Sequence, residues 1–225
     1  LICKNVKFNN IHKGEGCYMI VNFASLKYFD VSKLNDKISI GCGALFTHNN
    51  FDMLDVKYYY VSHPFFFYRY WKNPYKKKYE TNLVGAFYKR KIKEYPRVEY
   101  FMNLSNYFGL KGGNVHYVHH FGLVNDQELG YEINKIFTMM SGALVGMIGL
   151  ALYLGFEDIT LIACDYTSHP QMSGHFYEYG RNSDRYKGFI FYPDILSSLQ
   201  KKIKIRSLVI NDSYKGQIIP SITYS

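Results

Sequence analysis

The residue types best suited to chemistry lie between Asp165 and Tyr177. Asp165 and Tyr166 follow a short apolar run, and His175 and Tyr177 come shortly after. A histidine with a near-neutral pKa can accept a proton from a hydroxyl group, and tyrosine hydroxyls can donate hydrogen bonds to a phosphate. Structural alternatives stand beside these roles, since Asp165 could fix a loop and His175 could face solvent. The segment is therefore a candidate reaction centre.

The elements just before this segment would place it at one edge of a sheet. An apolar helix is predicted over 143–154 and a buried strand over 159–163. Open α/β sheets bind ligands at the carboxyl ends of their strands, where Asp165 and Tyr166 would lie. Ser141 and Gly142 precede the helix. Ser141 is a good N-cap, and the positive end of the helix suits a phosphate, although a plain capping serine is the alternative.

The rest of the chain alternates short apolar runs with helical patterns. Strands are predicted at 17–21, 37–41, 57–61, 97–102, 115–121 and 206–210, and helices at 82–93, 126–138 (a helix, or a loop followed by one) and 194–202. This order predicts an α/β class, with a Rossmann-like parallel sheet and helices on both faces. No linker or repeat divides the chain, so residues 1–225 are interpreted as a single domain.

Four more residues follow predicted strands and could bind a ligand. Asn22 and Ser25 come after the first strand, where backbone N–H groups suit a phosphate or a nucleotide sugar. Gly43 follows the second strand and allows either close approach of a ligand or a tight turn. His63 follows the third and could contact a base or ribose, or lie on the surface. The segment 21–25 contains no glycine, which argues against a dinucleotide-binding site.

Composition narrows the choice of partners. The net charge of +9 favours anionic partners, with basic runs at 76–78 and 89–93, although such runs are also typical of a solvated face. No nucleic-acid-binding fingerprint accompanies them. The four cysteines are scattered, and Cys17, Cys42 and Cys164 lie in or beside predicted strands, which is typical of buried thiols in a reducing compartment. No apolar run reaches the ~20 residues of a membrane span, and a cytoplasmic location is expected.

Three histidines, His116, His119 and His120, invite comparison with a metal site. Strand alternation would put His116 and His120 on one face and His119 on the other. That arrangement splits the set, and neither cysteine nor carboxylate stands at ligand spacing. No metal site is predicted.

Several segments resemble bacterial CMP-sialic-acid sialyltransferases. Val21-Asn22-Phe23-Ala24-Ser25-Leu26 resembles a degraded form of the family's Gly-Asn-Gly-Pro-Ser-Leu motif. Ser141-Gly142, the helix ending in Leu152-Tyr153-Leu154-Gly155-Phe156, and the strand from Ile159 to Asp165 resemble its second block, and the end of the chain through Asn211-Asp212-Ser213 also fits. The sialyltransferase-like domain of motility-associated flagellin glycosyltransferases and the MptE-like pterin diphosphokinases share a similar layout.

This resemblance implies a GT-A-like sialyltransferase type of Rossmann-like fold, with a small lid around 166–192, that works without a metal or other cofactor on a CMP-sugar donor. It implies that the donor is bound by Asn22, Ser25, Gly43, His63, Ser141 and Gly142. The family's base histidine lies farther downstream than any histidine in this chain, and His175 would take its place. Tyr166 and Tyr177 would stabilise the leaving group, and Asp165 matches the family's Asp after the central strand. The chain departs from the family at Gly43 and His63, where the family has asparagines, and at Thr167, where it has a tyrosine.

The implied function is transfer of a sialic-acid-like (nonulosonic) or other acidic sugar from a CMP donor to a glycan acceptor in surface polysaccharide synthesis. The acceptor could be lipid-linked, and the Lys/Arg runs could hold the protein at the inner membrane face; nucleic acid is not an expected partner. Two alternatives remain open. One is an MptE-like diphosphokinase that uses ATP and Mg²⁺, and the other is a non-catalytic module that binds a glycan or a membrane.

Overall fold

The computed structural model describes residues 1–67, 80–121, 129–139, 142–169, 172, 174–178, 193–216 and 219–224. Within them, nine strands form one sheet in the order β11-β9-β7-β1-β2-β3-β4-β5-β6, and all neighbours run parallel. These strands are β1 Gly16–Ile20, β2 Ser39–Cys42, β3 Val56–Val61, β4 Glu99–Asn103, β5 Val115–His120, β6 Ile136–Phe137, β7 Asp158–Ile162, β9 Lys204–Val209 and β11 Ser221–Thr223. A separate antiparallel pair joins β8 Ser168–His169 to β10 Lys215–Gly216. The predicted Rossmann-like α/β class is confirmed.

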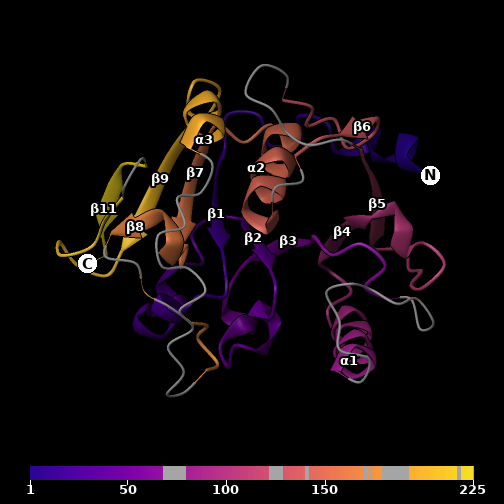
Figure 1. Cartoon of the computed structure of the whole chain (residues 1–225), viewed down its shortest axis with the longest axis horizontal. Coiled ribbons are helices and arrows are strands. Elements are labelled where there is room, and N and C mark those ends of the chain that lie inside the picture. The colour runs from indigo at the N-terminus through magenta and orange to yellow at the C-terminus, as the bar shows by residue number, and fades with distance from the viewer. Residues whose placement is uncertain are drawn as a thin grey trace.

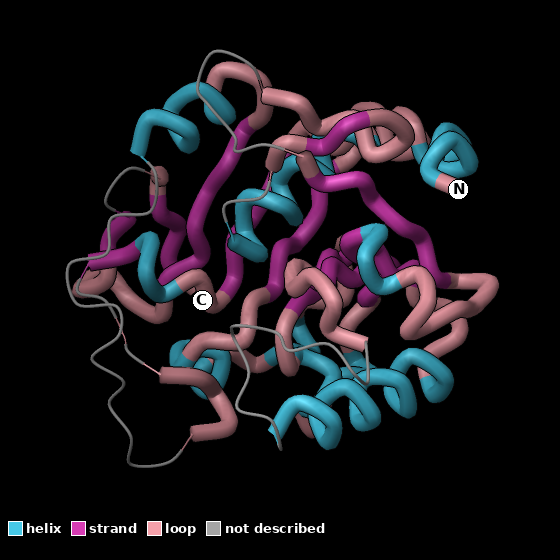
Figure 2. Tube along the Cα trace, turned by 45° about the vertical axis from the view of Figure 1, so that its right-hand side comes forward, coloured by secondary structure: helices cyan, strands magenta, loops and turns pink. Residues whose placement is uncertain are grey.

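Helices cover both faces of the sheet. The α-helices are α1 Glu80–Glu94, α2 Gly142–Leu154 and α3 Pro193–Gln200, and the 3₁₀ helices are η1 Ile2–Phe8, η2 Ala24–Tyr28, η3 Val31–Lys33, η4 Leu45–Thr47, η5 Phe51–Met53, η6 Leu104–Asn106 and η7 Asp165–Thr167. Figure 1 shows α2 and α3 above the row of strands, with α1 and the 3₁₀ helices η2–η5 of the indigo-to-purple segment below it. The sheet is therefore the middle of three layers, as Figure 2 also shows.

Strand β3 shows why the sheet is buried on both faces. Tyr58 and Tyr60 belong to the core that includes α2 and α3, whereas Tyr59 and Val61 belong to the core on the side of α1. Side chains alternate between the two faces of a strand, so an apolar run with no polar alternation needs cover on both sides. The predicted strand at 57–61 has this pattern, and the other predicted strands also match observed ones to within a few residues.

One predicted helix is wrong in the part that the structure describes. The pattern at 126–138 predicts a helix, but residues 129–139 contain turns and strand β6. Strand β6 pairs with the end of β5, with Ile136 opposite His119, and Tyr131 bridges Phe137. Pairing with a distant strand has overridden the local helical pattern. Most of the predicted lid at 166–192, and residues 122–128, lie outside the described residues.

The strand order places a topological switch between β1 and β7. The chain adds β2 to β6 on one side of β1, then places β7, β9 and β11 on the other side. Connections leave in opposite directions at such a point, so a crevice opens at the carboxyl ends of the strands. We call that edge, at the ends of β1, β2, β3 and β7, the carboxyl edge, and the opposite one the amino edge.

Candidate functional site

A cavity of about 990 Å³ lies at the carboxyl edge. Its walls come from the segments that follow β1, β2 and β3, from α1, from the start of α2 and from the segment around His175. The cavity has the volume and the location expected of a small-molecule site. Most of the residues singled out in the sequence line it: Asn22, Gly43, His63, Gly142, Tyr166, His175 and Tyr177. Ser141 lies outside the described residues.

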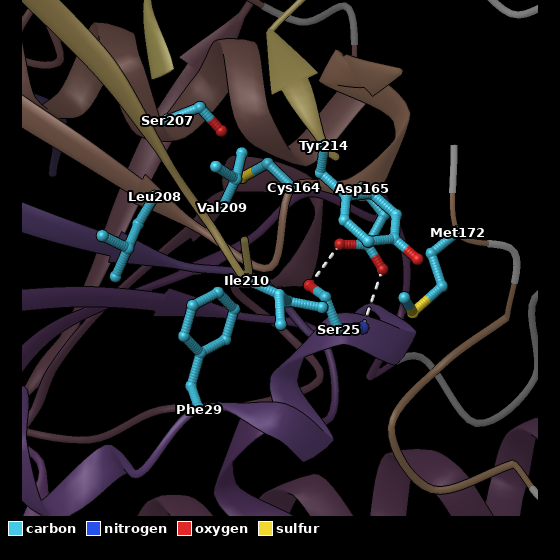
Figure 3. Close-up of a pocket in the computed structure, with 10 residues that line it drawn as sticks. All are labelled: Ser25, Phe29, Cys164, Asp165, Met172, Ser207, Leu208, Val209, Ile210 and Tyr214. Atoms are coloured by element: carbon cyan, nitrogen blue, oxygen red, sulfur yellow. Dashed lines mark hydrogen bonds between the residues drawn. The ribbon is translucent and has the colours of Figure 1, made fainter. Parts of the chain in front are cut away.

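Ser25 and Asp165 lie beside this cavity, where they bind each other. The Ser25 backbone N–H donates to Asp165 Oδ2 at 2.8 Å, and the Ser25 hydroxyl donates to Oδ1. Figure 3 shows both bonds at a second, much smaller cavity, also lined by Met172 and Tyr214. Neither residue lines the large cavity, so donor binding by Ser25 stays a prediction. The two bonds tie the loop after β1 to the loop after β7, which is the loop-fixing alternative stated for Asp165.

The Asp165 carboxyl is nearly buried, and this has an electrostatic cost. Burial raises its pKa to about 6, although the hydrogen bonds from Ser25 and Ala24 act in the opposite direction. Ala163, two residues before, has φ of 54°, a left-handed conformation that costs a non-glycine residue ~1–2 kcal/mol. Strained backbone of this kind is concentrated at functional sites. Here it turns the chain out of β7 so that Asp165 reaches Ser25.

His175 is held against the loop after β1 by backbone pairing. It forms an isolated antiparallel bridge with Phe23, and the flanking bonds run from Phe176 N–H to Asn22 O and from Ala24 N–H to Gly174 O. Its imidazole stacks on the Phe23 ring at a centroid distance of 5.5 Å and on the Tyr177 ring at 5.1 Å. These contacts fix the plane of the imidazole in the cavity wall.

Glu178 orients the same imidazole, and the sequence interpretation missed it. Its Oε1 lies 3.1 Å from His175 Nδ1, and its Oε2 accepts the His175 backbone N–H at 3.0 Å. A carboxylate only accepts, so this contact places a proton on Nδ1 and leaves Nε2 as the basic nitrogen. An acidic residue three positions after a candidate base is the signal that could have identified it.

Gly43 forms the tight turn predicted for it, and approach of a ligand to it stays a prediction. Its φ is +61°, and a Cβ there would lie 2.7 Å from Asn22 Oδ1, so only glycine lets the Asn22 side chain pack against it. The Gly43 carbonyl accepts hydrogen bonds from the hydroxyls of Tyr59 and Tyr88. Tyr88 belongs to α1, so this carbonyl also attaches α1 to the carboxyl edge.

The glycines of α2 bring that helix close to the sheet. A Cβ on Gly146 would lie 2.3 Å from the Tyr60 ring, and one on Gly149 would lie 2.8 Å from the Phe137 ring. Gly142, the exposed first residue of α2, has φ of +87° and lines the cavity with Ala143. The positive end of a 13-residue helix is thus directed to the cavity.

Two further cavity residues have limited chemistry of their own. His63 is exposed, its ring lies 5.6 Å from the Phe66 ring, and its backbone carbonyl accepts from Asn106 at 3.1 Å. Cys42 also lines the cavity, but burial raises the pKa of its thiol to about 12. A thiol with that pKa stays protonated at neutral pH and is a poor nucleophile. All four cysteines are free; Cys17, Cys42 and Cys164 are buried as predicted, and Cys3 is exposed.

His116 and His120 pack against Phe101 and Tyr60 of the core on the α2 side, as strand alternation predicts for these two residues. His116 contacts Glu99 at 2.5 Å, whereas His120 bonds Tyr60 and Asn103 near the cavity. Across the described ranges, no group of three His, Cys, Asp or Glu side chains could hold a metal ion. No helix in the same ranges is both long enough and apolar enough to cross a membrane.

No protein-family model matches the chain, and no curated protein or solved structure matches it either.

Proposed function

We propose that this protein is a metal-independent glycosyltransferase that moves a sialic-acid-like or other acidic sugar from a CMP donor to a glycan acceptor. One observation carries the proposal: an imidazole oriented by a carboxylate shares a cavity with phenol hydroxyls and a helix N-terminus. The first component suits a base, and the second suits a departing phosphate. Acid–base chemistry beside an anion-binding wall is what transfer from a nucleotide-linked sugar requires.

The reaction follows from the roles of these groups. His175 Nε2 accepts the proton of the acceptor hydroxyl while that oxygen attacks the anomeric carbon of the donor sugar. The bond from this carbon to the phosphate oxygen breaks, and CMP leaves. Tyr166 and Tyr177 donate hydrogen bonds to the phosphate as it gains charge, and Glu178 stabilises the imidazolium that forms. These residues supply the charge stabilisation that a bound cation supplies in other transferases.

The nucleotide end of the donor fits the wall formed by the ends of β1, β2 and β3. Asn22 offers a side-chain amide that packs against Gly43, and His63 stands at the exposed rim. The net charge of +9 favours an anionic donor. Ser25 and Asp165 contribute by holding the two loops on which Asn22 and Tyr166 lie.

The acceptor side of the proposal concerns α1. Leu83 is 65% exposed and Val84, which lines the cavity, is 42% exposed, while Arg90 on the same helix is 67% exposed at its side chain. Apolar and cationic side chains on one helix suit contact with an anionic membrane surface. We propose a lipid-linked glycan acceptor in surface polysaccharide synthesis, reached from the inner membrane face.

Thermal denaturation with two nucleotides tests the donor and the main rival. A ligand that binds only the native state stabilises it by about 2.7 kcal/mol at 100 times its Kd. We expect CMP to raise the melting temperature more than ATP with Mg²⁺ does. A shift with ATP and Mg²⁺ alone would instead favour the diphosphokinase that the resemblance also suggested.

Replacing His175 tests the base. We expect His175→Ala to retain CMP affinity and to lose transfer by on the order of 10²–10⁴, the usual contribution of general base catalysis. His48→Ala is the matched control, since His48 lies 5.3 Å from the Phe176 ring and is not among the cavity-lining residues. Full activity in His175→Ala would show that the base has been assigned wrongly. A non-catalytic module would show no transfer in any form.

A further inference from the structure

Tyr60 is a cavity residue whose hydroxyl lies against α2. It stands near the carboxyl end of β3, is 1% exposed and lines the large cavity. A Cβ on Gly146 would lie 2.5 Å from its hydroxyl oxygen, so the absence of a side chain on α2 makes room for this hydroxyl. Burial raises the Tyr60 pKa far above its ordinary value, and the hydroxyl therefore keeps its proton. The atom that accepts this proton depends on which way the hydrogen bond between Tyr60 and His120 runs.

The orientation of the Asn103 side chain decides which nitrogen of His120 carries a proton. Its side-chain Oδ1 accepts the backbone N–H of Ser105 at 2.8 Å, so its amide nitrogen Nδ2 points the other way. Nδ2 lies 2.8 Å from Nδ1 of His120. An amide nitrogen can only donate, so Nδ1 of the imidazole must be the acceptor and carries no proton. The hydrogen bond from Ser105 thus fixes the Asn103 amide so that Nδ1 of His120 is an acceptor.

The other end follows from the charge of His120. Burial, with a smaller contribution from the charge of His119, lowers the His120 pKa to about 4, so the ring is neutral at neutral pH. A neutral imidazole has one proton, which must be on Nε2 because Nδ1 accepts from Asn103. Nε2 lies 2.9 Å from the Tyr60 hydroxyl oxygen. The imidazole therefore donates to Tyr60, and the phenol proton remains available.

We propose that the Tyr60 hydroxyl donates its proton to an anionic phosphate oxygen of the nucleotide bound in the cavity, beside the first turn of α2. The proposal rests on the proposed function for the identity of that nucleotide. Two observations concern the same cavity. The first N–H groups of a helix have no partner within it, and Gly142 and Ala143 at that end line the cavity. The buried Tyr60 hydroxyl, packed against Gly146 of the same helix, adds a further donor for a phosphate oxygen.

Isothermal titration of wild type and Tyr60→Phe with CMP and with cytidine tests this subsite. We expect the Kd for CMP to rise about ten-fold or more in Tyr60→Phe, because a hydrogen bond to a charged group is lost, while the Kd for cytidine stays unchanged. Tyr58→Phe is the matched control: Tyr58 lies on the same strand and face and also bonds a histidine, His12. CMP affinity in Tyr60→Phe equal to wild type would overturn the proposal.

A second variant keeps Tyr60 and reverses the direction of its hydrogen bond with His120. In Asn103→Asp, a carboxylate would accept from His120 Nδ1–H, so Nε2 would become an acceptor and take the Tyr60 proton. NMR of the imidazole nitrogens of His120 should show the Nε2–H tautomer in wild type and the Nδ1–H tautomer in the variant. CMP affinity should fall in the variant even at about 0.5 M salt, which screens the added charge. An Nδ1–H tautomer in wild type would overturn the proposal.

Comparison of CMP with ATP separates this proposal from the proposed function. If wild type binds ATP and not CMP, the transferase donor is wrong, and the same loss of ATP affinity in Tyr60→Phe still supports the phosphate subsite. If wild type binds CMP and Tyr60→Phe binds it equally well, the subsite is wrong while the donor stands. Binding of neither nucleotide overturns both.

Discussion

Two tyrosine–histidine pairs on β3 use the same residue types in opposite ways. Towards the amino edge, Tyr58 lies 2.7 Å from His12 Nε2, and Glu15 lies 3.0 Å from His12 Nδ1. The carboxylate places the histidine proton on Nδ1, so Nε2 accepts the Tyr58 proton. Towards the carboxyl edge, an amide takes the place of the carboxylate, and the direction of donation reverses at Tyr60.

This difference shows that the partner on the far nitrogen of the imidazole decides what the phenol can do. The Tyr58 hydroxyl proton is donated to His12, and the His12 Nδ1 proton is donated to Glu15. His12 also stacks on Phe156 at a centroid distance of 4.5 Å, so that pair is structural. At Tyr60 one proton remains, and the residue lines the cavity. Variants at Gly146 and Asp165 act at the carboxyl edge, and a variant at Tyr58 acts at the amino edge.

The largest effect is expected where α2 meets Tyr60. In Gly146→Ala the new methyl group would overlap the buried Tyr60 ring, and we expect unfolding free energy to fall by about 3 kcal/mol or more and CMP binding to be lost. Gly16→Ala is the control at the amino edge, because a Cβ there would meet its nearest neighbour at 3.4 Å. Urea denaturation measures both. Equal losses would show that close packing is not special to the carboxyl edge.

A pH-dependent effect is expected from Asp165. Its native pKa of about 6 exceeds the value of 3.8 for an unperturbed carboxyl, so the native state still holds a proton that the unfolded chain has lost. This group therefore adds stability as pH falls, by about 2 kcal/mol from about pH 6.5 to about pH 4.5. Asp165→Asn should lack this gain, as measured by urea denaturation at the two pH values.

His120 acts in the opposite sense over much of the same range. Its pKa is lowered from 6.5 to about 4, so the unfolded chain binds the proton more readily and stability falls as pH decreases. The two groups partly cancel in wild type, and Asp165→Asn should reveal the His120 dependence as a steeper loss of stability in acid. Identical pH profiles for wild type and Asp165→Asn would contradict the burial of an ionisable Asp165.

The smallest effect on CMP binding is expected at the amino-edge pair. Tyr58→Phe leaves the buried His12 Nε2 without its donor, which costs about 1–3 kcal/mol. We expect lower stability in urea and unchanged CMP affinity. A change in CMP affinity larger than the one in Tyr60→Phe would mean that the two pairs have been assigned the wrong way round.

Much of the fold and part of the site are predictable from residue patterns. Apolar runs such as 57–61 identify the strands, and glycines and polar residues mark where they end. Because parallel strands end at one edge, Asn22, Gly43, His63, Tyr166 and His175 can be expected near each other without knowledge of a single contact. The helix expected at 126–138 fails because β6 depends on a partner that the local pattern does not contain.

The hydrogen-bonded pairs that decide the chemistry cannot be predicted in the same way, because they join residues far apart in the sequence. The bond of Ser25 to Asp165 joins residues 140 positions apart, and that of Tyr60 to His120 joins residues 60 apart. Residue composition and the spacing of apolar residues could place each of these residues near the end of a strand. Both features depend only on near neighbours along the chain. Which nitrogen bears a proton depends on groups that meet only after the sheet and its helices pack, so the folded chain alone assigns the donors and acceptors.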